Sequence, residues 1–78
     1  MMRSKDVVPT TRLRYKAGTE EWEIRTVVTV LTTGPTGAIC RVDEMPQVGM
    51  ERIREGFSDY LPGKEIIASY RELYPLDE

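Results

Sequence analysis

The sequence contains no histidine among its 78 residues. Histidine is the only side chain whose unperturbed pKa lies near neutrality, and it is the commonest general base and metal ligand. Its absence excludes histidine-based catalytic triads and histidine-dependent zinc sites. Acid–base catalysis would need another group with a strongly shifted pKa, which the thin core of so short a chain can hardly supply. We therefore expect no enzyme activity and no catalytic residue.

Cysteine is nearly absent as well, because Cys40 is the only one. A single cysteine excludes an intramolecular disulfide, and its place in a β-type run is typical of a small buried apolar residue. The acidic residues cluster only as Glu20-Glu21-x-Glu23 and Asp43-Glu44, without the alternate spacing around a glycine of a calcium loop. The sequence therefore predicts no metal site and no cofactor.

Long apolar runs are also missing. No stretch approaches the roughly 20 residues that span a bilayer, and Met1–Asp6 leads into no apolar core of a signal peptide. With one cysteine and no targeting pattern, we expect a reduced, cytoplasmic location and no contact with membranes.

The chain has no large excess of either positive or negative charge, since the formal net charge is −2. The distribution is uneven, however: the first 16 residues hold five cations against Asp6, and residues 43–78 are predominantly acidic. A molecule with a basic beginning and an acidic end is dipolar, and this asymmetry bears on its partners more than the net value does.

A β-hairpin is the clearest element of the chain. Residues 21–31 are rich in β-branched side chains, residues 32–37 contain two glycines and a proline, and a second β-type run covers residues 38–42. Ahead of the hairpin, residues 12–17 alternate between polar and apolar side chains. The sequence predicts a three-stranded antiparallel β-meander over about 12–43.

After the meander the hydrophobic period changes to three and four residues. This spacing predicts two short helices, over about 49–61 and about 64–74, and the class is then α+β. An all-β alternative keeps residues 50–60 extended, as the fourth strand of a small SH3-like β-barrel with a C-terminal helix. All of residues 1–78 form a single domain in either case, with 1–10 as a flexible or edge segment.

The long strand presents two different faces. Its even positions are the better core face: Trp22, Ile24, Thr26, Val28 and Val30. The opposite face carries Val27 and Leu31, and Ile39 lies across the turn from them. If both helices cover the even face, these three residues need either the N-terminal segment or another chain over them. They are candidate partner-binding residues, and they are compatible with a homo-oligomer.

A row of cations is the second candidate surface. On a strand, the alternate side chains Arg12, Arg14 and Lys16 lie about 6.8 Å apart, which is close to the phosphate spacing of one nucleic-acid strand. Such a row also suits an acidic protein partner or a solvated strand face.

The third candidate surface is formed by Tyr70 and Tyr74 on the second predicted helix, because tyrosine is enriched in interface hot spots. Together these features favour a small non-enzymatic protein-binding module with an accessory, regulatory or inhibitor role. Small inhibitors carried by phages and other mobile elements share this size and lack of motifs. The alternative is a weak nucleic-acid-binding protein that uses the basic N-terminal strand face.

Overall fold

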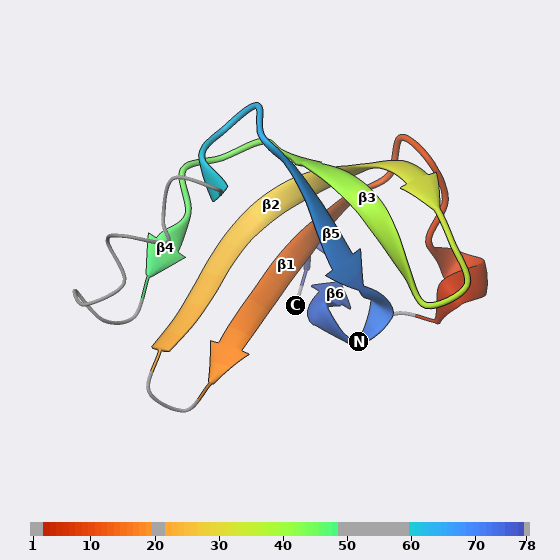
Figure 1. The fold of residues 1–78 in the computed structure, drawn as a ribbon, viewed down its shortest axis with the longest axis horizontal. Coiled ribbons are helices and arrows are strands. Elements are labelled where there is room, and N and C mark those ends of the chain that lie inside the picture. Colours follow the sequence, from red (N-terminus) through yellow and green to blue (C-terminus); the bar gives the residue numbers. More distant parts are fainter. Residues whose placement is uncertain (1–2, 20–21, 49–59, 78) are drawn as a thin grey trace.

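The computed structural model describes residues 3–19, 22–48 and 60–77 (Figure 1). The elements are η1 (Ser4–Asp6), β1 (Arg12–Thr19), β2 (Trp22–Thr33), β3 (Gly37–Val42), β4 (Gln47–Val48), β5 (Glu65–Ser69), η4 (Tyr70–Glu72) and β6 (Leu73–Tyr74), where η marks a 3-10 turn. The strand order is β5-β3-β2-β1-β6, with β4 paired to β2, and every pair is antiparallel. Figure 1 shows a strongly curled sheet whose two end strands, β5 and β6, are joined through η4.

The predicted meander is present. β1 pairs with β2 along its whole length, and β2 pairs with β3 across a turn that the Gly34 amide closes by donating to the Gly37 carbonyl at 2.8 Å. The register shifts between Val30 and Thr32, so a bulge at Leu31 interrupts the alternation of β2.

The predicted α+β class is wrong, because the described residues contain no α-helix. Residues 64–74, expected as a helix, form β5, η4 and β6. The two consecutive isoleucines of β5 fit a pleated surface beside β3, and their β-branched side chains gain little in a helix. Of the other predicted helix, residues 49–59 lie outside the described part of the chain. The all-β architecture fits the alternative as far as a small β fold, with η4 where its C-terminal helix was expected. Its fourth strand, predicted over residues 50–60, lies outside the described residues up to residue 59.

The core lies on one side of the curled sheet. As predicted, the even positions Ile24, Thr26, Val28 and Val30 of β2 are buried, whereas the side chain of Trp22 lies outside the description. The core cluster also contains Val7, which precedes the sheet, and residues of β1, β3, β5 and β6: Leu13, Tyr15, Ala38, Cys40, Val42, Ile66, Ala68 and Leu73. The last three come from β5 and β6, so the C-terminal strands close a core that the meander alone leaves open.

No helix among the described residues has the length and apolar character needed to cross a bilayer.

Candidate functional site

Strand pairing brings Ile39 of β3 and Ile67 of β5 directly opposite each other. The hydrogen bonds at the two ends of this ladder show which of its residue pairs are hydrogen-bonded. The Val42 amide donates to the Lys64 carbonyl at 2.8 Å, and the Tyr70 amide donates to the Thr36 carbonyl at 3.4 Å. Hydrogen-bonded and non-hydrogen-bonded pairs alternate in an antiparallel ladder. Ile39 and Ile67 are therefore a non-hydrogen-bonded pair, the arrangement that brings side chains closest together.

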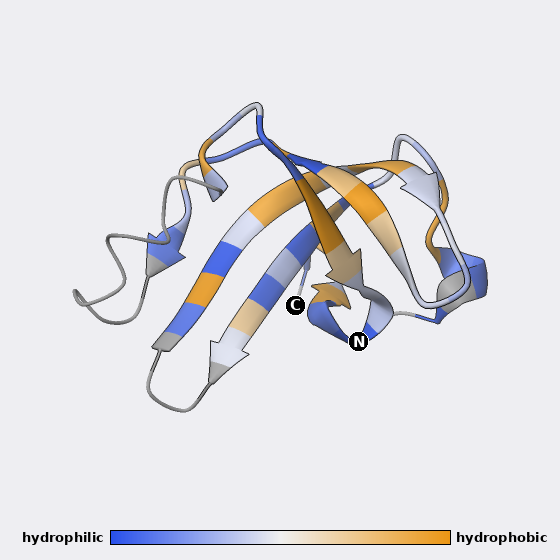
Figure 2. Cartoon of the chain, viewed as in Figure 1, coloured by the Kyte–Doolittle hydropathy of each residue, from blue (hydrophilic) through white to orange (hydrophobic). Residues whose placement is uncertain are grey.

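Both isoleucines face away from the core. Ile39 is 40% exposed and Ile67 is 82% exposed, whereas isoleucine is among the residue types most often buried. Figure 2 shows apolar colouring along β5 where it lies next to β3. The pair borders a hollow of about 390 Å³ between the β2–β3 turn and the end of β5. We call Ile39, Ile67 and this hollow the β3–β5 face.

The walls of the hollow are held by specific contacts. The Tyr70 hydroxyl donates to the Gly34 carbonyl at 2.6 Å, which fastens the β2–β3 turn to η4. The Glu72 carboxylate accepts the Ser69 amide at 2.9 Å. The β3–β5 face is thus built on strands and a tethered turn, which favours a preformed surface.

The structure does not assemble the predicted apolar patch as one surface. Val27 is only 6% exposed and is buried by its own chain, so it needs no second chain to cover it. Leu31 is half-buried at the bulge, and only Ile39 of the three is exposed.

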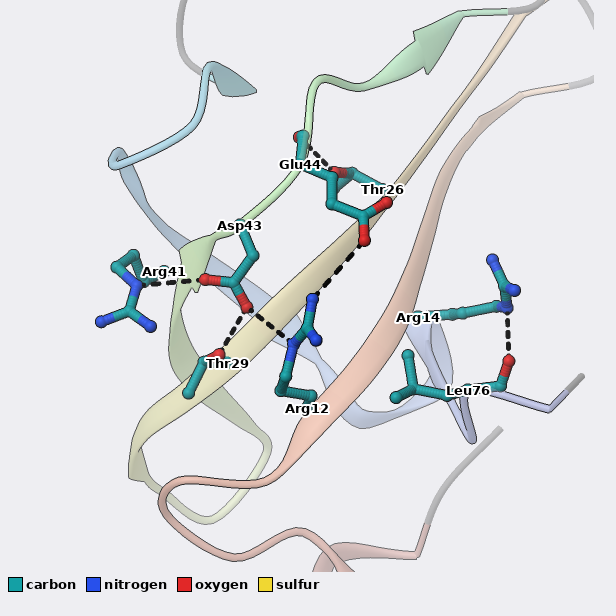
Figure 3. A network of polar contacts seen from close by, with 8 residues as sticks. All are labelled: Arg12, Arg14, Thr26, Thr29, Arg41, Asp43, Glu44 and Leu76. Atoms are coloured by element: carbon teal, nitrogen blue, oxygen red, sulfur yellow. Dashed lines mark hydrogen bonds and ion pairs between the residues drawn. The ribbon is translucent and has the colours of Figure 1, made fainter.

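The basic row is already engaged in contacts within the chain (Figure 3). Arg12 lies 3.5 Å from carboxylate oxygens of both Asp43 and Glu44, and Arg14 Nε donates to the Leu76 carbonyl at 2.8 Å. The Lys16 ammonium lies 4.6 Å from the centre of the half-buried Tyr74 ring, a cation–π distance. Tyr70 is half-buried, and its hydroxyl is occupied by Gly34.

Asp43 is the centre of the polar network in Figure 3. Its carboxylate accepts the Thr29 hydroxyl at 2.5 Å and Arg41 Nε at 3.1 Å, and Arg12 Nε lies 3.5 Å away. Burial by itself would raise the pKa of the Asp43 carboxyl. The hydrogen bonds from Thr29 and Arg41 and the two guanidinium charges outweigh it and hold this pKa below its usual value.

We expect the protein to lose stability in acid through Asp43. A carboxyl whose pKa is lowered by folding contributes stability that is fully present above its unfolded pKa of about 3.9 and is lost as the pH falls through the folded pKa. The measurement is the urea midpoint at a series of pH values from 6 to 2. The control variant Asp43→Asn cannot ionise, so its midpoint should fall less steeply below pH 4; equal slopes would contradict the assignment.

Cys40 is fully buried, and burial raises the pKa of its thiol to about 11. The thiol is therefore protonated at neutral pH and has no path to a substrate. Elsewhere in the described ranges, no three histidine, cysteine, aspartate or glutamate side chains come together as metal ligands would.

Sequence reasoning missed Ile67 as a surface residue because it assigned this position to the apolar stripe of a helix. The residue types gave no signal that could have corrected this, because Ile66, Ile67 and Ala68 are consecutive apolar residues. The alternation with period two is in their burial, which only the pairing of β5 with β3 produces.

No family model, no curated protein and no solved structure matches this chain.

Proposed function

We propose that this chain is a small non-enzymatic protein-binding module, with an accessory, regulatory or inhibitor role, and that it contacts its partner through the β3–β5 face. The observation that carries the proposal is the 82% exposure of Ile67 directly beside the exposed Ile39. Two adjacent aliphatic side chains in water are an unfavourable surface feature unless another surface covers them.

The surroundings of this pair support the proposal. On one side the next outward pair is Arg41 and Glu65, and on the other it is Gly37 and Ser69. An apolar centre with a polar rim is the usual organisation of a protein–protein interface. The adjoining hollow offers room for a side chain of the partner, and an anchor in such a pocket carries a large part of the binding free energy.

Nucleic-acid binding receives less support from the geometry. Phosphates would have to displace Asp43 and Glu44 from Arg12 and the Leu76 carbonyl from Arg14. These replacements exchange existing contacts for new ones, so the net electrostatic gain is small compared with that of a free cationic row.

We expect Ile67→Asp to reduce recovery of the partner about 30-fold, the loss that corresponds to a hot-spot residue of about 2 kcal/mol. The experiment captures proteins on the tagged chain from nuclease-treated lysate of the native source, and quantifies the stoichiometric one. Met45→Asp is the matched control, since Met45 is also an exposed apolar residue, at 61%, but lies outside the β3–β5 face. Equal recovery with both variants would contradict the proposed surface.

A further inference from the structure

The open edge of β5 carries backbone groups that β3 does not use. β5 stands at the end of the strand order and, within the part of the chain that the structure describes, pairs only with β3. Glu65 and Ile67 belong to the non-hydrogen-bonded pairs of that ladder, so their amide and carbonyl groups point away from β3. Ser69 points the same way, but its amide is taken by the Glu72 carboxylate.

This edge lacks most features that prevent strands from adding to it. Edge strands are commonly protected by proline, by a bulge, by charged residues or by a covering element. The residues from Glu65 to Ser69 contain no proline, their register with β3 runs without a shift, and the one charged residue is the first. Ile67, at the middle of the edge, is the most exposed large apolar residue of the described chain.

We infer that β5 pairs antiparallel with β5 of a second copy of this chain, about a two-fold axis perpendicular to the sheet. The two copies then form one continuous sheet across an isologous contact. This inference goes beyond the proposed function and does not depend on it.

Glu72 favours one register of this pairing. Because the Ser69 amide is occupied, only Glu65 and Ile67 offer both a donor and an acceptor at the edge. The self-pairing that uses all of these groups sets Glu65 of each copy opposite Ile67 of the other. Each such pair exchanges two backbone hydrogen bonds, so the ladder has about four, and Ile66 faces its own copy at the axis.

A second copy matches the side chains as well as the backbone. The axis keeps outward residues on the outer face and inward residues on the core face, as the alternation of a sheet requires. The two Ile67 side chains lie diagonally across the junction, within reach of each other, and each continues into Ile39 of its own chain. The result is a row of isoleucines over the joined sheet. Such a short ladder buries less area than a standard interface, so the association is weak and depends on concentration.

The test is sedimentation equilibrium across a wide range of concentrations. For the native chain, we expect the apparent mass to rise from 9.0 kDa, the mass of one chain, toward twice that value. Glu65→Pro removes an outward amide, introduces a residue that edge strands tolerate, and leaves Ile39 and Ile67 in place. This variant should remain a single chain at every concentration. The matched control Glu65→Thr keeps the amide and should still associate.

Amide hydrogen exchange of the native chain tests the same contact without a substitution. The amides of Glu65 and Ile67 should become protected at high concentration, while that of Ser69 stays the same. A constant mass of one chain would overturn the inference, and so would association that leaves these two amides unprotected or that Glu65→Pro does not reduce. Partner capture by Glu65→Pro separates the two proposals, because the β3–β5 face is intact in that variant.

Discussion

Replacing Gly37 by alanine is expected to destabilise the protein by about 3 kcal/mol, near the upper end of the usual cost of overpacking. A Cβ atom at this position would lie 2.3 Å from the Ala68 carbonyl oxygen, a distance that real contacts do not show. The obstructing atom belongs to the backbone of β5, so no side-chain rotation relieves the clash. β3 and β5 must separate at this end, which also disturbs the tethered turn beside the hollow.

Gly34→Ala is the matched control for this variant. Gly34 lies in the same turn, and a Cβ atom there would meet only the Gly37 carbonyl oxygen, at an ordinary contact distance of 3.5 Å. Urea unfolding followed by circular dichroism should show a much lower midpoint for Gly37→Ala and a nearly native midpoint for Gly34→Ala. Equal midpoints would mean that β3 and β5 do not approach as closely as the structure indicates.

Leu73→Ala should cost about 3 kcal/mol, whereas Ile67→Ala should change the free energy of unfolding by less than about 0.5 kcal/mol. Leu73 is fully buried in the core cluster, and its removal leaves a cavity that the sheet cannot close. Ile67 is 82% exposed, so its truncation removes few contacts within the chain.

This contrast distinguishes the strand from the helix that the sequence suggested. In a helix over residues 64–74, Ile67 and Leu73 would share one apolar stripe, and both truncations would be costly. The comparison is made by denaturant unfolding at low protein concentration, where self-association does not contribute. A large loss of stability for Ile67→Ala would contradict the exposed position of this side chain.

The β-meander could be predicted from sequence because its signals are local. β-branched residues, alternation and a turn with two glycines each indicate the same structure between residues 12 and 43. The buried positions followed from the same alternation, since Ile24, Val28 and Val30 occupy one face of β2.

The C-terminal segment was mispredicted because its apolar residues fit two periods. Ile66, Ile67, Tyr70 and Leu73 have helical spacing when taken together, but the structure divides them among a strand, a 3-10 turn and a second strand. The extended conformation is favoured over the helix because β3 and β1 each have an edge that can pair with a segment far away in the sequence. The spacing of apolar residues within one segment contains no information about such long-range partners.

In the candidate site, too, local features could be predicted from the sequence and features that depend on long-range pairing could not. Ile39 was recognised because it lies on the predicted hairpin, and Ile67 was missed because its exposure depends on the pairing of β5. The basic row was located correctly on β1, but its neighbours Asp43, Leu76 and Tyr74 come from other parts of the chain. Charge counting along the sequence cannot show that a cation is already engaged.

By itself, the sequence determined the hairpin, the inward face of its long strand and the lack of histidine-based chemistry, because these depend on residue type and local spacing. The tertiary structure alone decided that the C-terminal segment is extended, that Val27 is buried and that Ile39 and Ile67 are exposed side by side. Each of these depends on which strands pair with each other, and the pairs that decide them join segments that lie far apart in the sequence.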